Sequence, residues 1–260
     1  MAFVSYSIIP LPALKDNYIW MLEDPYSLET VAVDPGEADP VFAYLQETKR
    51  TLNGILITHH HGDHTHGVKE LLKKHSVPVY GAFNSSFHLT NRLLKDGERF
   101  SLFPHGLVIT GIAIPGHTLD HMAFYAPSFV FTGDTLFSAG CGRVFEGTAP
   151  QMWNSLKKLR DLPEDTYVYC GHEYTAQNLL FAKQVDPQNQ HLLHHSEWVH
   201  DQRKLGNPTL PSTIGLEKKI NPFLRIEEPE VKEAICAHEG KKELTPHALF
   251  GALREWKNHF

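Results

Sequence analysis

The first two-thirds of the chain alternates short apolar segments, rich in β-branched and aromatic residues, with turns and amphipathic helical stretches. This alternation is typical of a layered protein in which helices cover sheets. The apolar segments predict strands at residues 4–9, 18–23, 30–33, 54–57, 77–80, 107–114, 129–131 and 167–170. The amphipathic stretches predict helices at residues 39–48, 67–75, 149–160 and 174–184.

The pattern changes after about residue 174, where strand signals vanish. Helical segments at 190–205, 229–238 and 245–258 follow, joined by loops that contain proline. The connection at 206–213 carries two prolines, which restrict its backbone, so it is expected to be ordered. We therefore predict two domains, residues 1–174 with the sheets and residues 175–260, which are mainly helical.

Composition excludes several classes of protein. The 260 residues are 42% hydrophobic and 21% charged, as expected of a globular chain that can bury a substantial core. The net charge of −6 argues against nucleic acid or an anionic membrane surface as a partner. An anionic substrate would need local basic residues to attract it against this charge.

The N-terminal segment and the cysteines both bear on the compartment. The segment lacks a basic region with a cleavage site, and no apolar run approaches the roughly 20 residues that span a bilayer. Cys141, Cys170 and Cys236 are too few and too scattered for a disulfide framework, which fits a reducing compartment. We expect a cytoplasmic protein with structural cysteines, and keep a nucleophilic cysteine as an alternative.

One short motif is rich in potential metal ligands. His59, His61, Asp63 and His64 lie within six residues, directly after the predicted strand 54–57. Imidazole nitrogen and carboxylate oxygen together suit zinc, iron or manganese. In an extended backbone His59 and His61 point the same way and can share one ion. Asp63 and His64 follow a turn that Gly62 permits and can reach a second ion. A solvated histidine-rich loop is the alternative interpretation.

Three further candidate ligands follow predicted strands in the same manner. His117, Asp134 and His172 each come after a strand, and each is preceded by a glycine that allows a tight turn. Strands that lie side by side would bring these loops to one edge of a sheet, where such folds commonly place their chemistry.

The resulting seven ligands suit two ions. One ion would be held by His59, His61 and His117, the other by Asp63, His64 and His172, with Asp134 bridging. We expect two divalent ions per chain, zinc first, with iron or manganese as alternatives. A shared water, made acidic by the ions, would supply hydroxide, so the predicted reaction is hydrolysis, with Asp63 and Asp134 as the catalytic carboxylates.

Through these residues the chain resembles the metallo-β-lactamase superfamily. Segments 12–18, 131–137, 140–148 and 170–175 resemble more closely the glyoxalase II, or hydroxyacylglutathione hydrolase, family within it. The resemblance covers almost the whole chain. It implies an αββα sandwich followed by a smaller helical domain that helps to bind glutathione.

The resemblance also implies a substrate site. It places Arg143, Phe145 and Tyr174 in a glutathione pocket, together with the C-terminal pair Arg254 and Lys257. Some family members have lysine and tyrosine where this chain has Arg143 and Phe145. Arginine keeps the charge, whereas Phe145 lacks the hydroxyl of tyrosine.

The expected reaction is hydrolysis of an S-2-hydroxyacylglutathione, S-D-lactoylglutathione first, to glutathione and a 2-hydroxy acid such as D-lactate. This is the second step of methylglyoxal detoxification. We expect a monomer that acts on this small-molecule thioester, without a nucleic-acid or membrane partner. The alternatives are a mononuclear iron persulfide dioxygenase of the same superfamily and a catalytically idle metal-binding module.

Overall fold

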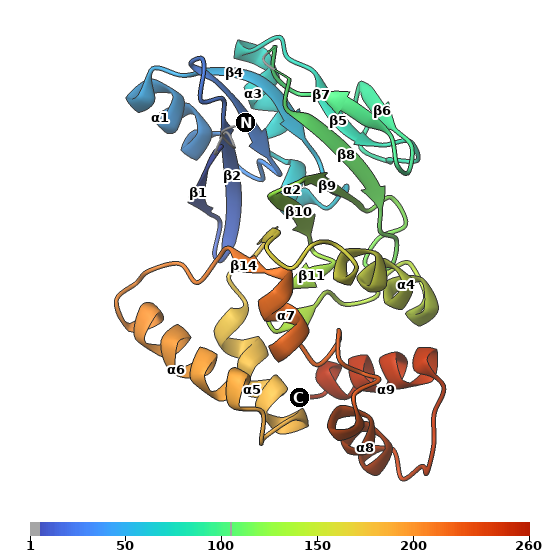
Figure 1. Ribbon diagram of the computed structural model, residues 1–260. Coiled ribbons are helices and arrows are strands. Elements are labelled where there is room, and N and C mark those ends of the chain that lie inside the picture. The colour runs from blue at the N-terminus through green and yellow to red at the C-terminus, as the bar shows by residue number, and fades with distance from the viewer. Residues whose placement is uncertain (1–5, 105) are drawn as a thin grey trace. The chain divides into compact units, whose positions relative to one another are not determined.

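The computed structural model describes residues 6–104 and 106–260, and the chain divides into two compact units (Figure 1). The first unit comprises the described residues of Met1–Ala113 together with Asp120–Gly133. The second comprises Ile114–Leu119 together with Asp134–Phe260. The predicted domain boundary after residue 174 stays a prediction.

The first unit contains the strands of two sheets. Its strands are β1 (Ser7–Ala13), β2 (Asn17–Glu23), β3 (Glu29–Val33), β4 (Thr51–Leu56), β5 (Val79–Ala82), β6 (Arg92–Leu94), β7 (Arg99–Ser101), β8 (Val108–Ala113), β9 (Met122–Ala126) and β10 (Phe129–Gly133). The first six form a mixed sheet in chain order, antiparallel from β1 to β3 and parallel from β3 to β6. Strands β7 to β10 pair antiparallel in chain order.

The two sheets face each other in this unit. Tyr80 on β5 stacks on Phe100 on β7 with ring centroids 4.5 Å apart, and the Asn53 amide donates to the Leu102 carbonyl at 3.1 Å. On its other face the first sheet is covered by α1 (Asp39–Thr48) and α3 (Val68–Lys74), which share a buried apolar cluster with it. The short helix α2 (Gly62–Thr65) lies between β4 and α3 in the chain.

The second unit is mainly helical. Its helices are α4 (Ala149–Arg160), α5 (Thr175–Val185), α6 (Gln190–Lys204), α7 (Ile214–Ile220), α8 (Pro229–His238) and α9 (Pro246–Asn258). Its strands are β11 (Leu136–Phe137), β12 (Gly140–Cys141), β13 (Tyr167–Cys170) and β14 (Ser212–Thr213), paired β11 with β12 and β13 with β14. Stacked rings of Trp153 and Phe250 join α4 to α9.

The predicted architecture is confirmed, a two-sheet sandwich followed by a helical C-terminal region. Helices α1, α4 and α8 match their predicted ranges at both ends, as does strand β13. Local signals set such limits: in α4 the Thr148 and Gln151 side chains form a capping box and a proline occupies the first turn. The predicted strand 4–9 begins outside the described residues, and the structure has β1 at Ser7–Ala13.

One short strand lies beyond residue 174, where the pattern shows no strand signal: β14 pairs with β13 through Ser212 and Thr213. Two residues carry no readable alternation, so this pairing is a tertiary contact that the local pattern could not show. None of the described helices is both long and apolar enough to cross a membrane.

Candidate metal centre

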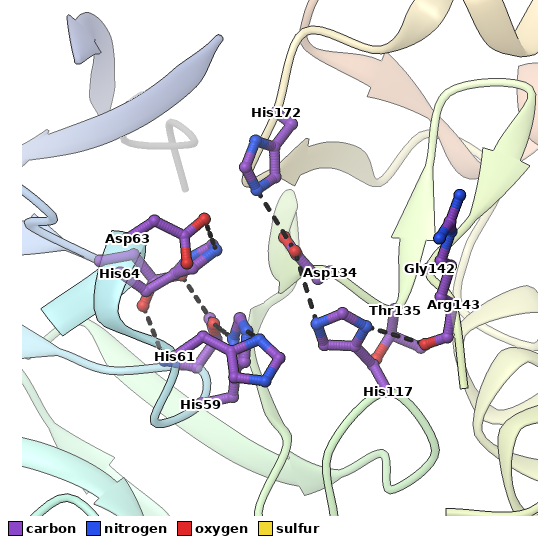
Figure 2. A network of polar contacts seen from close by, with 12 residues as sticks. His59, His61, Asp63, His64, His117, Asp134, Thr135, Gly142, Arg143 and His172 are labelled. Atoms are coloured by element: carbon purple, nitrogen blue, oxygen red, sulfur yellow. Dashed lines mark hydrogen bonds and ion pairs between the residues drawn. The ribbon is translucent and has the colours of Figure 1, made fainter. Parts of the chain in front are cut away.

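The four candidate ligands of the motif at 59–64 lie close together within the first unit. The chain leaves β4, runs without regular structure to His61, and enters α2. His59 Nε2 lies 3.1 Å from His61 Nδ1, and the rings of His59 and His64 are 4.2 Å apart. The Asp63 carboxylate is 3.5 Å from His64 Nε2 (Figure 2). The predicted pairing of His59 with His61 is thus present in the structure.

Buried acceptors fix the orientation of two of these rings. Thr58 Oγ1 lies 3.0 Å from His59 Nδ1, and Asp34 Oδ2 lies 3.0 Å from His64 Nδ1. A histidine whose Nδ1–H is held in this way presents the lone pair of Nε2, which is the form that binds a metal.

Asp34 lies at the site although the sequence analysis did not single it out. Its buried carboxylate accepts the Thr58 N–H at 2.7 Å and the Thr58 hydroxyl at 2.6 Å, in addition to its contact with His64. Because β3 and β4 are parallel neighbours, their carboxyl ends bring Asp34 and Thr58 to the same edge. A polar residue directly after a buried strand was the available signal.

Asp63 has a supporting residue too. The buried Asn17 amide donates to the Asp63 carboxylate at 3.1 Å and to its backbone carbonyl at 3.3 Å. The carboxylate is otherwise partly open, with a side chain 40% exposed. Asn17 therefore limits the positions that this exposed ligand can adopt.

The role predicted for Gly62 needs correction. Gly62 begins α2 and has no positive φ. A Cβ at this position would meet the His66 ring at 2.4 Å. The His66 ring thus occupies the space of a side chain at this position and would have to move to admit one.

The other three ligands converge within the second unit. Asp134 Oδ2 lies 3.6 Å from His117 Nε2 and 3.3 Å from His172 Nε2, so the carboxylate stands between the two rings (Figure 2). All three side chains are buried. His117 Nδ1 contacts the Arg143 carbonyl at 2.8 Å, which again leaves Nε2 to face the carboxylate.

Close backbone packing supports this ligand set. A Cβ on Gly142 would meet the Asp134 carbonyl at 1.8 Å and His117 Nδ1 at 3.1 Å, so only glycine fits. The turn expected before Asp134 is present, because Gly133 has a φ of +46°.

The donor sets fit a divalent transition metal. Two ligands on one such ion, each about 2.0–2.2 Å from it, lie about 3.0–3.5 Å apart. The separations of 3.1 Å for His59 and His61 and 3.3 Å for His172 and Asp134 fall in this range. Neutral imidazoles with carboxylates are also the ligands that zinc, iron and manganese accept.

Three of the predicted substrate residues lie next to the second ligand set. The exposed Phe145 ring meets the His117 ring edge-on at 5.2 Å, and Tyr174 stacks on His172 at 4.6 Å. The Arg143 side chain is exposed, while its carbonyl holds His117. Their contact with substrate stays a prediction.

The C-terminal pair on α9 is partly engaged in internal contacts. The buried Arg254 guanidinium donates to the Cys141 carbonyl at 2.7 Å. The half-buried Lys257 amine donates to the Asn178 side chain. Burial, and then the nearby Arg254 charge, lower the pKa of Lys257 to about 7.

The cysteines have no features of a nucleophile. Cys141 and Cys170 are buried, and burial raises the pKa of both thiols. A reactive cysteine needs a lowered pKa and access to solvent. Both therefore act as apolar side chains.

Two further histidines near the motif have structural neighbours. His60 Nδ1 contacts the buried Asp120 carboxylate at 2.8 Å, and His121 stacks on His59 at 4.5 Å. His60 thus has a carboxylate partner outside the set of candidate ligands, and His121 lies beside the candidate ligand His59.

Comparison with known proteins decides the family. The model described as the metallo-beta-lactamase superfamily matches residues 29–172, and the model described as the hydroxyacylglutathione hydrolase C-terminus matches residues 173–260. A hydroxyacylglutathione hydrolase of Psychromonas ingrahamii is 44% identical, covering 98% of this chain and 99% of its own. That of Chromohalobacter salexigens is 47% identical, with the same coverage of both chains.

The chain belongs to the hydroxyacylglutathione hydrolase family. Solved structures of other proteins have a similar fold. ETHE1 from Myxococcus xanthus matches with a TM-score of 0.66 at 25% identity, covering 96% of both chains. The BLEG-1 B3 metallo-beta-lactamase matches with a TM-score of 0.62 at 24% identity, over 85% of this chain and 99% of its own.

Asp34→Asn tests the support of His64. Asparagine keeps the shape and tolerates the φ of +52° at this position, but it replaces one acceptor oxygen by a donor. We expect zinc affinity to fall about 10–100-fold, as is usual when such a supporting residue is lost, measured by competition with a chelator. Asp39→Asn, at the exposed start of α1, is the control. Equal affinities in the two variants would contradict the role of Asp34.

Proposed function

We infer that this chain hydrolyses the thioester of an S-2-hydroxyacylglutathione, the glyoxalase II step of methylglyoxal detoxification. The single observation that carries this inference is the near-full-length identity of 44–47% to hydroxyacylglutathione hydrolases. The match of the C-terminal family model to residues 173–260 supports it, because a general metal hydrolase would not need that region. S-D-lactoylglutathione is the substrate we propose first.

We propose that the seven candidate ligands hold two divalent ions. His59, His61 and His117 would hold one, Asp63, His64 and His172 the other, with Asp134 as a ligand to both. When bound, such ions lower the pKa of water toward neutrality and stabilise negative charge on a carbonyl oxygen. Zinc is the first candidate, with iron and manganese as alternatives.

The protein's own groups would prepare the ligands for this task. Thr58, Asp34 and the Arg143 carbonyl hold the Nδ1 atoms of three histidines, so that ligand geometry is set before an ion or substrate arrives. Preorganised groups cost no rearrangement at the moment of reaction. Asp63 and Asp134 supply the negative charge that keeps the ions in place.

On the substrate side, we propose that Arg143 and Lys257 attract the carboxylates of glutathione. Arg143 is exposed and suits a carboxylate by two parallel hydrogen bonds. Tyr174 and Phe145 would line the pocket beside the second ligand set. Arg254 donates to the backbone carbonyls of Cys141 and Gly142 and so supports the segment that precedes Arg143. Direct contact of Arg254 with glutathione remains a prediction.

The experiment that tests the function is hydrolysis of S-D-lactoylglutathione by the purified protein, with metal content measured on the same preparation. We expect turnover that a chelator abolishes and added zinc restores. Absence of turnover with two ions bound would contradict the proposed substrate. One bound iron, with oxygen consumption on glutathione persulfide, would favour a dioxygenase instead.

Phe145→Tyr tests the substrate pocket. The ring is 62% exposed, so an added hydroxyl meets no steric barrier and can donate to glutathione. One hydrogen bond contributes about 0.5–1.5 kcal/mol, which predicts a KM lowered roughly two- to tenfold at an unchanged kcat. Phe83→Tyr, at a ring 61% exposed in the first unit, is the matched control. If Phe145→Tyr changes KM no more than Phe83→Tyr does, the placement of Phe145 in the substrate pocket is contradicted.

The titration of Lys257 predicts a pH dependence of substrate binding. Its pKa of about 7 means that the amine is charged below this pH and neutral above it. If the ammonium pairs with a glutathione carboxylate, KM should rise up to about tenfold between about pH 6 and about pH 8. Lys257→Arg stays charged in this range, so its KM should be flatter with pH. Parallel profiles in the two enzymes would exclude this ion pair.

A further inference from the structure

The tip of the β11–β12 hairpin is held by hydrogen bonds from the C-terminal helices, all within the second unit. Asn221 donates to the carbonyls of Phe137 and Gly140 at 3.1 and 2.9 Å. Asn178 donates to the Ser138 carbonyl at 2.9 Å, and Arg254 to the Cys141 carbonyl at 2.7 Å. Side chains of α5 and α9, and that of Asn221 directly after α7, thus donate to one five-residue segment.

Glu217 on α7 completes this set as the acceptor. Its Oε2 receives the Ala139 N–H at 2.8 Å and the Asn221 amide at 3.0 Å, and its Oε1 receives the Ser212 hydroxyl. Ala139 has a φ of +54°, a conformation that costs an alanine about 1–2 kcal/mol. The bond from its N–H to Glu217 is therefore made at the most strained residue of the hairpin.

Burying a carboxyl group costs free energy of folding. Glu217 has no exposed surface, and burial raises the pKa of its side chain. An apolar residue of similar volume usually stabilises a core as well as a buried polar one does, or better. The arrangement is therefore better explained by the position that it imposes on the hairpin than by stability alone.

The two ends of the hairpin reach the second ligand set. Asp134 comes two residues before β11, and Arg143, whose carbonyl contacts His117, comes two residues after β12. Between these ends, the Gly142 N–H donates to the Thr135 carbonyl at 3.2 Å. Gly142 packs directly on the backbone of Asp134, so a displaced hairpin must displace both Asp134 and the support of His117.

We propose that Glu217 is a positioning residue for the metal centre: through Ala139 and Asn221 it fixes the β11–β12 hairpin, and thereby the Asp134 carboxylate and the His117 ring. This role rests on the metal-dependent function proposed above. It connects the helical C-terminal region to the reaction by a route separate from substrate binding.

Two variants of Glu217 test the proposal. Glu217→Leu keeps the volume but removes both acceptors. Glu217→Gln retains a carbonyl oxygen for Ala139 and Asn221, while its amide can face the Ser212 hydroxyl. We expect Glu217→Leu to lose zinc affinity about 10–100-fold, measured by titrating the metal-free protein against a chelator, and Glu217→Gln to restore most of it. In turnover, kcat should fall in Glu217→Leu and KM should stay.

Asp186→Leu is the matched control. Asp186 is also a buried carboxylate of the second unit, but its partners are Arg225 at 3.1 Å and Asn189 at 2.9 Å rather than the hairpin. We expect this variant to melt at a lower temperature with zinc affinity unchanged. An equal loss of affinity in Asp186→Leu and Glu217→Leu would overturn the proposal, as would a folded Glu217→Leu with the zinc affinity of the parent protein.

Asn221→Ala serves if Glu217→Leu does not fold. It removes the donors to Phe137 and Gly140, and the same loss of zinc affinity is expected; unchanged affinity would overturn the proposal. The zinc titration uses no substrate. A parent protein that binds two ions but leaves S-D-lactoylglutathione intact would therefore contradict the proposed function and not the role of Glu217.

Discussion

A histidine can bind a metal through Nε2 when a hydrogen-bond acceptor holds the proton on Nδ1. Much of this structure positions such acceptors beside the candidate ligands. Asp34 holds His64, Thr58 holds His59, and a backbone carbonyl holds His117. Each acceptor depends in turn on a larger element: the parallel pairing of β3 with β4 places Asp34, and the β11–β12 hairpin places the carbonyl. The positions of the histidine rings therefore depend on the edge of the sheet and on the helical region as well as on the motif at 59–64.

The helical region accordingly has two roles in this account. We propose that its basic residues bind glutathione, while Glu217, Asn221 and Arg254 form hydrogen bonds with the hairpin. The two roles meet at α9, where Arg254 lies one helical turn from Lys257.

The sequence predicts the seven candidate ligands from local signals, a run of histidines and Gly-His or Gly-Asp pairs after apolar strands, and the structure places them in two close groups. Their role as metal ligands stays a prediction. The helices were predicted from their amphipathic pattern. Glu217 was missed because its partner Ala139 lies 78 residues away, a separation that no local pattern encodes. Asp34 follows an apolar strand as the predicted ligands do, but its contacts with Thr58 and His64 exist only once β3 and β4 have paired. Gly62 was assigned to a turn, and the His66 ring that occupies the space of a side chain there is visible only in three dimensions.

The central claim is that two ions share the Asp134 carboxylate. Anomalous diffraction at the zinc edge, on crystals of the zinc-loaded protein, tests it most directly. The account predicts two peaks about 3.5–4 Å apart, each within about 2.2 Å of Asp134 and of three further ligands. A single peak, or two peaks of which only one contacts Asp134, would contradict it.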